Sequence, residues 1–283
     1  MTTSGSLTIV GTGIQAGQLT IAAKNAIEQA DKLLYFVTDP LATAYLHGLN
    51  PTAESLAHFY GEGKDRLVTY MEMVERILDE VKRGLNVCAA FYGHPGVFVL
   101  PAHEAIRRAR EAGMTATMLP GISAEDCLFA DLGIDPAFPG CQNFEATDFL
   151  VYRREFDVTA SLILWQIGMI GVQTAEIREL AARNLGVLAE YLSGFYGPDH
   201  HVVIYEASAY PDLDCRAELT TLGALAAARV SRISTLYVAP KNVPRSVDRD
   251  MVRRLGMNEE AVQSLEAKLA LKLDSIRTTL FGA

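Results

Sequence analysis

The first half of the chain alternates between short apolar runs and longer amphipathic segments. Apolar runs at 7–10, 33–37, 87–91 and 115–119 have the length and composition of buried strands. Between them, apolar residues recur every three or four positions, most clearly over 66–82, which predicts helices. Strands and helices that alternate in this way pack as a sheet covered by helices, so we expect an α/β domain.

The second half has the same ingredients with shorter connections. We expect strands at 161–167, 202–205 and 234–239, and two helices at 174–183 and 185–194. This order predicts a second α/β domain with a more mixed sheet. The pattern loosens over 135–152, which we interpret as the crossing between the domains. The predicted division is an N-terminal α/β domain over 1–125, a C-terminal α/β domain over 126–245 and a helical extension over 246–283.

The helical extension carries a stripe of apolar residues at three- and four-residue steps. The stripe consists of Val262, Leu265, Leu269, Leu273, Ile276 and Leu280. Apolar residues on one face of a terminal helix require a surface to dock against. The body of the same chain is the default expectation, and a dimer mate or a partner helix is the alternative.

Composition narrows the classes of function. Of 283 residues, 49% are hydrophobic and 21% are charged, which is ordinary for a globular protein with a buried core. A net charge of −9 disfavours a large phosphate-binding surface, so nucleic acid is not an expected partner. No apolar run reaches the roughly 18 residues of a membrane helix and no secretory signal precedes the first strand, so we expect a cytoplasmic protein without membrane contact. The four cysteines lack metal-ligand spacing, so we expect free buried thiols and no metal site.

Three predicted strands end in glycine-containing turns that lead into helices. Gly11-Thr12-Gly13 follows the first strand and partly matches a dinucleotide fingerprint, for which Asp39 is the acid placed to hold a ribose. The segments 91–98 and 120–124 follow two further strands. Ligands of open α/β sheets bind beyond the carboxyl ends of strands, so both turns are candidate binding loops at one end of a sheet. A plain strand-to-helix turn at 91–98 and a helix-capping role for Ser123 remain open.

These segments resemble the tetrapyrrole methylase superfamily, and within it the borosin peptide α-N-methyltransferases, over roughly residues 5–240. The motifs that carry the resemblance are Gly11-Thr12-Gly13, Tyr92-Gly93-His94-Pro95-Gly96-Val97-Phe98, Pro120-Gly121-Ile122-Ser123-Ala124-Glu125, Trp165-Gln166 and Ile233-Ser234-Thr235-Leu236. Gly93-His94-Pro95 stands where the superfamily usually has Gly-Asp-Pro, and Ile14 follows Gly13 where a Gly-Pro-Gly is usual. Both departures favour the borosin branch.

The resemblance implies a two-domain, tetrapyrrole-methylase-like fold whose cleft holds S-adenosylmethionine, with S-adenosylhomocysteine as product. Matching motif positions supply the implied cofactor contacts, which offer exposed backbone groups or apolar surface to the cofactor. These contacts are Tyr92, His94, Val97, Phe98, Ser123, Ala124, Gln166, Tyr205, Ala207, Ser234 and Thr235. For His94, a hydrogen bond that only stabilises its own turn is the alternative.

The resemblance also implies a catalytic set of Tyr60, Arg66 and Tyr70. From the pattern alone, Arg66 is expected to extend to solvent at the helix start, because long charged side chains usually do. The resemblance reverses that expectation and turns Arg66 toward Tyr70, one helical turn away. An amide nitrogen must lose its proton or its resonance before it attacks a methyl group, so a base and an oxyanion donor are needed. We expect the arginine cation to lower the pKa of a neighbouring tyrosine, and the sequence does not say which tyrosine is the base.

The resemblance further implies a ribosomally made precursor peptide as substrate and a homodimeric enzyme. Ala283 follows the terminal helix directly, so we expect a split system that methylates a separate precursor in trans, as a heterotetramer with two peptides. A uroporphyrinogen or precorrin methyltransferase is the first alternative. A peptide-binding module that has lost turnover is the second.

Overall fold

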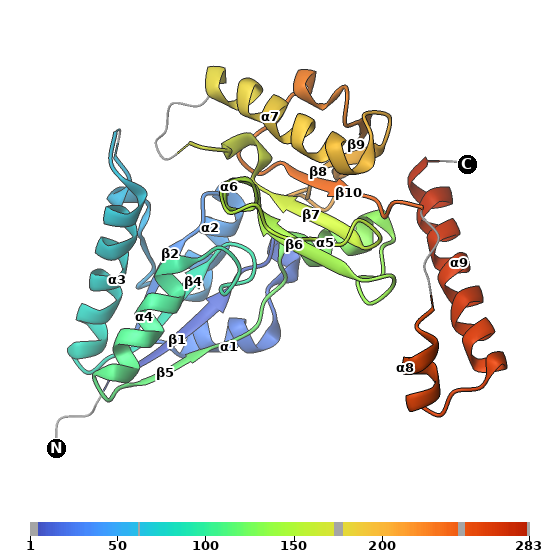
Figure 1. Ribbon diagram of the computed structural model, residues 1–283. Helices are drawn as coiled ribbons and strands as arrows, with labels where there is room; N and C mark the ends of the chain where they lie inside the picture. Colours follow the sequence, from blue (N-terminus) through green and yellow to red (C-terminus); the bar gives the residue numbers. More distant parts are fainter. Residues whose placement is uncertain (1–4, 62, 173–177, 243–246, 282–283) are drawn as a thin grey trace. The chain divides into compact units, whose positions relative to one another are not determined.

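Figure 1 shows the computed structural model of the chain, which describes residues 5–61, 63–172, 178–242 and 247–281. The chain forms two compact units, each built on a five-stranded sheet. Unit 1 includes the chain up to Cys127 and the segment Ala207–Asp214. Unit 2 includes Leu128–Val172, the strand that precedes Ala207, and the chain from Cys215 onward. Two sheets with flanking helices confirm the expected α/β class.

Unit 1 is an open parallel sheet in the order β3-β2-β4-β1-β5. Its strands are β1 (Ser6–Gly11), β2 (Lys32–Phe36), β3 (Glu54–Ser55), β4 (Asn86–Phe91) and β5 (Thr115–Met118). Its helices are α1 (Ile21–Gln29), α2 (Pro40–Leu49), α3 (Arg66–Lys82) and α4 (Leu100–Glu111), with 3-10 turns η1 (Ala16–Gln18) and η2 (Ala57–Phe59). The division between the units falls within α5 (Ala124–Leu132). The four strands expected in this half are confirmed within one or two residues.

Side chains of the central strands alternate between two cores. Ile9 of β1 and Ala89 of β4 pack with apolar residues of α3 and α4. Val10 and Ala90, the next residues along each strand, pack with residues of α1 and α2. Strands that are buried on both faces carry apolar residues at nearly every position. This is why they are visible in the sequence as continuous runs.

Helix α3 has the bounds that its apolar spacing predicts. Asp65 caps its N-terminus, where the carboxylate accepts a hydrogen bond from Leu67 N at 2.7 Å. The predicted stripe buries Met73, Val74, Ile77, Leu78 and Val81 in the first core. Tyr70 lies at the edge of that core and is half-buried, as is Arg66 one turn before it.

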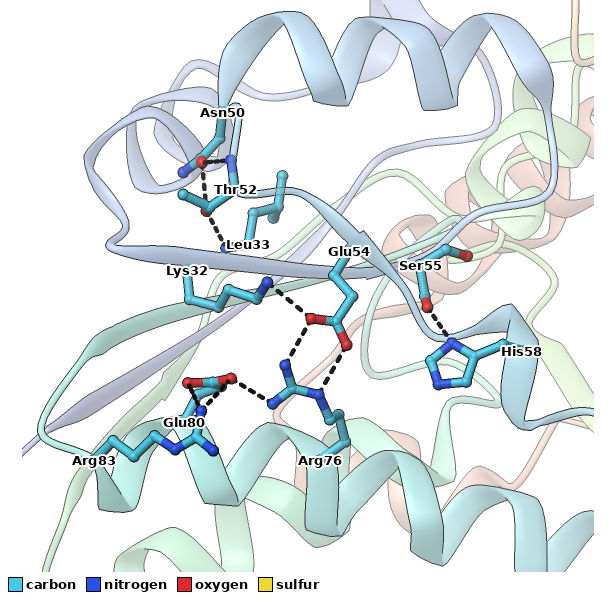
Figure 2. Close-up of polar contacts among 10 residues, drawn as sticks. All are labelled: Lys32, Leu33, Asn50, Thr52, Glu54, Ser55, His58, Arg76, Glu80 and Arg83. Atoms are coloured by element: carbon cyan, nitrogen blue, oxygen red, sulfur yellow. Dashed lines mark hydrogen bonds and ion pairs between the residues drawn. The ribbon is translucent and has the colours of Figure 1, made fainter.

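An ionic cluster ties α3 to the short edge strand β3 (Figure 2). The Arg76 guanidinium donates from Nε and Nη2 to the two Glu54 carboxylate oxygens, at 2.8 and 2.6 Å. Lys32 of β2 reaches the same carboxylate at 2.8 Å, and Arg76 also pairs with Glu80 at 2.5 Å. The hydrogen bonds from Arg76 lower the pKa of Glu54 to about 2, against the desolvation that opposes them. Strand β3 is too short to be recognised in the sequence, and this cluster anchors it.

Glu54→Gln is expected to reduce stability at neutral pH by at most about 3 kcal/mol, with a defined pH dependence. The folded-state pKa of Glu54 lies below its ordinary value of 4.5, so its stabilising contribution is present above that value. That contribution is lost as pH falls toward 2. The difference in unfolding free energy between wild type and variant, measured by urea denaturation, should therefore shrink from pH 5 to about pH 2. A difference that stays constant over this range would contradict the ion-pair account.

Unit 2 is a mixed sheet in the order β6-β7-β10-β8-β9, as expected. Its strands are β6 (Cys141–Glu145), β7 (Ser161–Trp165), β8 (His201–Glu206), β9 (Arg216–Thr221) and β10 (Thr235–Val238). Only β6 and β7 pair in parallel, and the other neighbours are antiparallel. Its helices are α6 (Ala146–Val151), α7 (Arg178–Tyr196), α8 (Arg249–Arg254) and α9 (Glu259–Phe281), with 3-10 turns η3 (Ile167–Met169) and η4 (Leu225–Ala227).

Two expectations for this half are wrong. The stretch 135–152 forms β6 and α6 inside unit 2 instead of a crossing, and β6 escapes recognition because an edge strand is only half-buried. The helices expected at 174–183 and 185–194 are one helix, α7, with 174–177 outside the described residues. Asn184, at the expected break, donates from Nδ2 to Ile170 O at 2.8 Å, so its polar side chain bonds to the segment after η3 while the helix continues.

The cysteines are less uniform than expected. All four lie among the described residues, and only Cys88, on the central strand β4, is buried. The other three are partly exposed, so the expectation of four buried thiols is wrong for them. Cys141 lies on the edge strand β6 and Cys215 directly precedes the edge strand β9, where side chains are covered on fewer sides.

The C-terminal extension forms α8 and α9. Val262 and Ile276 of the predicted stripe are buried, whereas Leu265 is 48% exposed. The chain therefore covers its own stripe only in part. Within the residues that the structure describes, no helix combines the length and apolar character needed to cross a membrane.

Candidate active site

The carboxyl edge of the unit 1 sheet gathers the turns that follow β1, β4 and β5. Gly13 N donates to Gly93 O at 3.3 Å and Gly93 N donates to Gly13 O at 3.0 Å. A Cβ at Gly121 would lie 3.1 Å from both Gly11 Cα and Gly93 O. The absence of a side chain at Gly121 lets these backbones approach closely. The expectation that the turns at 91–98 and 120–124 meet at one end of a sheet is confirmed.

His94 shapes the turn after β4. Its Nδ1 accepts a hydrogen bond from Gly96 N at 2.9 Å, which requires an unprotonated Nδ1. The carbonyl of Gly96 contacts His103 Nε2 of α4 at 2.9 Å. The His94 side chain therefore stabilises its own turn, which is the alternative role expected for it.

The same turn presents apolar surface to solvent. Tyr92, Val97 and Phe98 are all exposed, Phe98 by 51% of its surface. Phe98 has a φ of 56°, which is uncommon for a residue with a side chain and is found most often at functional sites. Exposed aromatic and aliphatic side chains beside glycine backbone fit a ligand with a flat apolar ring and several hydrogen-bonding groups, such as an adenosine. These residues therefore fit the nucleoside part of the implied cofactor.

Ser123 begins the turn into α5 and is nearly fully buried. Its hydroxyl donates to Asp126 Oδ2 at 2.7 Å and accepts from Glu125 N at 3.2 Å. The capping role that the sequence left open is thus present, and Ala124 is the first helical residue. The backbone N–H of Ser123 also donates to Asp126 Oδ2 at 2.7 Å, so both donors of this residue are engaged within the cap.

Tyr60 lies at the same edge of the sheet. It follows η2, and its ring stacks on Phe36 at the end of β2, with ring centroids 5.2 Å apart. The carbonyl of Phe36 accepts a hydrogen bond from Tyr92 N at 3.2 Å. One strand end therefore contacts both the first predicted catalytic residue and the first predicted cofactor residue.

The three predicted catalytic residues lie together. Burial raises the pKa of the Tyr60 phenol above its ordinary value of 10.0, and the proximity of Tyr70 and a hydrogen bond with it raise it further. The guanidinium of Arg66 is close enough to oppose this shift but does not outweigh it. Arg66 thus lowers the pKa of Tyr60 as expected, but the net shift is upward because desolvation of the phenolate is the larger effect.

In unit 2, Gln166 follows β7 in the left-handed conformation, with φ 58°. The next residue, Ile167, donates its backbone N–H to Ser234 O at 3.0 Å. The Ser234 hydroxyl is buried and donates to Glu206, which also accepts from Ser231 Oγ at 2.9 Å. Glu206 therefore holds the turn that carries Ser234 and leads into Thr235, the first residue of β10.

The remaining predicted residues divide between the units. Tyr205 is buried in β8 of unit 2, where its hydroxyl donates to Asp131 Oδ2 at 2.6 Å. Thr235 is buried in β10 of the same unit. Ala207 belongs to unit 1, where the segment Ala207–Asp214 is held by Tyr210, whose hydroxyl donates to Asp39 Oδ2 at 2.8 Å. That carboxylate also accepts from Ala42 N at 2.8 Å, so the acid of the dinucleotide fingerprint is already engaged.

The structure gathers no metal-ligating cluster of three or more His, Cys, Asp or Glu residues within its described ranges. Over residues 6–226, the sequence matches the family described as Tetrapyrrole (Corrin/Porphyrin) Methylases. The chain belongs to the tetrapyrrole methylase family. The glycine turns and the pair of α/β sheets are thus those of a tetrapyrrole methylase.

Among curated proteins, this tetrapyrrole methylase is similar to fungal borosin precursors. It is 46% identical over 257 residues to the methyltransferase/ribosomally synthesized cyclic peptide gymnopeptides precursor of Gymnopus fusipes, covering 89% of this chain and 61% of the relative. It is 42% identical over 263 residues to the methyltransferase/ribosomally synthesized type I borosin cyclic peptide precursor of Coprinopsis marcescibilis, covering 90% and 67%. The chain spans about three fifths of the length of the first of these relatives. These likenesses make it a borosin-type tetrapyrrole methylase.

Solved structures agree on the fold. The uroporphyrin-III-C-methyltransferase of Thermus thermophilus has a TM-score of 0.58 at 17% identity, covering 84% of this chain and 93% of that one. The cobalt precorrin-4 methyltransferase CbiF has a TM-score of 0.59 at 17% identity, covering 82% and 94%. The expected fold of this tetrapyrrole methylase, two α/β sheets with a C-terminal helix, is confirmed.

Two residues that contact the predicted site segments were not singled out by the sequence: Glu206 in unit 2 and Lys64 in unit 1. Glu206 directly follows Tyr205 at the carboxyl end of a predicted strand, and that position was the available signal. Lys64 lies between the predicted catalytic residues Tyr60 and Arg66 in the chain. No periodicity marks a lysine in a glycine-containing loop, so its contacts are visible only in the structure.

Proposed function

We propose that this borosin-type tetrapyrrole methylase is an S-adenosylmethionine-dependent enzyme that α-N-methylates backbone amides of a ribosomally made precursor peptide. The observation that carries the proposal is the sheet edge at which Phe36 contacts both Tyr60 and Tyr92. This edge supports a site in which the tyrosine–arginine–tyrosine set acts next to the glycine turns, with a nucleoside bound on those turns. The names of the fungal relatives give the substrate class.

S-adenosylmethionine, when bound, supplies an electrophilic methyl group on its sulfonium sulfur. The residues that would hold it are among the predicted cofactor contacts, which in unit 1 include Tyr92, Val97 and Phe98. In unit 1, exposed Val97 and Phe98 offer apolar surface and the glycine turns offer backbone groups. Two of these contacts, Phe98 and Gln166, have positive φ, and such backbone strain is typical of ligand sites.

The side chains supply what an amide lacks as a nucleophile. Its nitrogen lone pair is delocalised into the carbonyl, so the amide proton must be removed while negative charge on the carbonyl oxygen is stabilised. In the transfer, a nitrogen–carbon bond forms, the carbon–sulfur bond breaks, and the amide proton passes to a base. Arg66 provides the permanent positive charge next to Tyr60.

The raised pKa of Tyr60 suggests different roles for the two tyrosines, one as a hydrogen-bond donor and the other as the base. A phenol that keeps its proton is a hydrogen-bond donor, so we assign Tyr60 as a donor to its partner or to the developing oxyanion. We assign Tyr70, the other tyrosine of the set, as the residue that accepts the amide proton. Arg66 stabilises the negative charge that results. This assignment selects one of the two tyrosines that the sequence left equivalent.

The arrangement of enzyme and precursor is a separate question. A precursor supplied in trans, with a homodimer that binds two peptides as a heterotetramer, stays our prediction. The relatives are named as methyltransferase and precursor in a single chain, which is the competing arrangement. Both arrangements use the same chemistry at the methylated amide.

The test is to incubate the purified chain with S-adenosylmethionine and a peptide that copies the precursor portion of the gymnopeptide relative. We expect mass increments of one methylene per transfer, localised to backbone nitrogens by fragmentation. Native mass spectrometry of the same sample reads the assembly. As a control, the same peptide is fused to the C-terminus of the chain.

Each outcome is informative. Methylation only of the fused peptide would overturn the trans arrangement and keep the chemistry. Cofactor binding without transfer to either peptide would identify a non-catalytic module. Methylation of uroporphyrinogen instead of peptide would overturn the substrate class.

A further inference from the structure

Lys64 connects the loop of Tyr60 to helix α3. Its ammonium donates to Phe59 O at 2.9 Å and forms an ion pair with the carboxylate of Glu72. Phe59 directly precedes Tyr60, and Glu72 lies two residues after Tyr70 on α3. One side chain thus joins the backbone that carries one predicted catalytic tyrosine to the helix that carries the other.

The loop has few other constraints. Gly61, Gly63 and Asp65 are exposed, so apolar packing does not hold the described part of the loop in place. Gly63 has a φ of 69°, and a Cβ there would meet open space. One backbone hydrogen bond, from Lys64 N to Gly61 O at 3.2 Å, closes a turn within the loop. The Asp65 cap fixes the end of the loop to α3, and ahead of this cap glycine-containing backbone has conformational freedom unless a further contact restrains it.

Tyr60 itself depends on this loop for its position. It remains 42% exposed, and its ring stacks on Phe36. Its hydroxyl must still lie near Tyr70 for the two phenols to influence one another. A stacked ring can slide in its plane, so stacking alone does not fix the hydroxyl.

We propose that Lys64 is a positioning residue for methyl transfer, because it fixes the loop that carries Tyr60 against α3 and so keeps Tyr60 beside Tyr70 and Arg66. The proposal rests on the proposed function for its kinetic consequences. Its structural part, the Tyr60–Tyr70 contact, is independent of that function.

The first experiment compares Lys64→Met, Lys64→Arg and Glu72→Gln in peptide methylation. Misplacement by about 1 Å costs up to a hundredfold, so we expect Lys64→Met to lower kcat about tenfold or more. The KM for peptide and the Kd for S-adenosylmethionine should stay within about twofold, since Lys64 is not assigned to either ligand. Lys64→Arg keeps a cation and should retain most of the wild-type kcat. Glu72→Gln leaves the hydrogen bond from Lys64 to Phe59 O in place, so its loss of kcat should be smaller than that of Lys64→Met.

The matched control is Lys82→Met. Lys82 is an exposed lysine at the other end of α3 and pairs with Asp79 at 3.7 Å. The Lys82→Met substitution removes a lysine and an ion pair from the same helix and leaves the Tyr60 loop unchanged. We expect its kcat and thermal stability to equal those of wild type, because exposed ion pairs contribute little.

A second readout does not need activity. The ultraviolet titration of Tyr60 is obtained as the difference between each protein and its Tyr60→Phe counterpart. In wild type and Lys82→Met, Tyr60 should ionise well above pH 10.0, the ordinary value for tyrosine. In Lys64→Met it should ionise closer to that value, because a displaced Tyr60 is better solvated and loses its contact with Tyr70.

The two readouts separate the hypotheses. If Lys64→Met matches Lys82→Met in both kcat and the Tyr60 titration, the positioning role is wrong. If no peptide is methylated by wild type, the proposed function fails and the titration alone decides the role of Lys64. Should Lys64→Met fail to fold, Lys64→Arg and Glu72→Gln carry the same comparison.

Discussion

Tyr70→Phe and Arg66→Ala are each expected to lower the rate of peptide methylation at least about a hundredfold, with S-adenosylmethionine still bound. General-base catalysis contributes about 10²–10⁴-fold, and a charge that stabilises an oxyanion contributes a similar factor. Both groups lie on the first turns of α3, which is capped by Asp65 and anchored by Arg76, so their loss leaves the helix in place. Single-turnover methylation followed by mass spectrometry measures the chemical step, and calorimetry measures cofactor binding.

Tyr60→Phe should behave differently from Tyr70→Phe. Its phenol keeps its proton, so its removal deletes a hydrogen-bond donor and not a base. We expect a loss of about tenfold, in the range of one hydrogen bond to a charged group. Tyr152→Phe, at an exposed tyrosine of unit 2, is the control. Near wild-type rates for Tyr70→Phe and Arg66→Ala with cofactor bound would remove these residues from the mechanism.

Gly11→Ala is expected to weaken S-adenosylmethionine binding by at least about a hundredfold and to destabilise the fold by about 1–3 kcal/mol. A Cβ at Gly11 would lie 2.2 Å from Gly93 O and 2.7 Å from Pro95 Cδ. The turn after β4 must therefore move away from β1, and that turn carries Tyr92, His94, Val97 and Phe98. Calorimetric affinity and urea unfolding of the same variant measure the two effects.

Alanine substitutions at two further glycines, Gly17 and Gly121, serve as controls for Gly11→Ala. Gly17→Ala adds a methyl group in open space within η1, so both affinity and stability should remain unchanged. At Gly121 the nearest atoms would be 3.1 Å away, a contact that small shifts relieve, so Gly121→Ala should give an intermediate loss. Equal affinity in all three variants would show that the junction of the turns is not part of the cofactor site.

Sequence periodicity was most informative where burial is regular. The stripe on α3 predicted the bounds of that helix, because one face of a helix buried in a core leaves a mark at every third or fourth residue. The continuous apolar runs of β1, β2 and β4 had the same clarity, since both of their faces are covered. The edge strands β6 and β9 were missed because a half-exposed strand mixes polar and apolar residues.

The meeting of the glycine turns also followed from the sequence. Parallel strands have their carboxyl ends at one edge, so turns after β1, β4 and β5 converge once the sheet is parallel. The partners of polar side chains did not follow. Ser234 donates to Glu206, and Lys64 spans from Phe59 to Glu72, through contacts that no local pattern encodes.

By itself, then, the sequence determined the fold class, the sheet edge that carries the candidate site and the identity of the motifs there, because each depends on local periodicity or on a short run of residues. Only the tertiary structure decided that Tyr60 lies beside Tyr70 with a raised pKa and that Lys64 holds its loop. Those properties depend on desolvation and on contacts between segments that approach one another only after folding. Burial raises the pKa of the phenol by more than the nearby cation lowers it. The degree of burial depends on the packed site and not on the neighbouring residues in the chain.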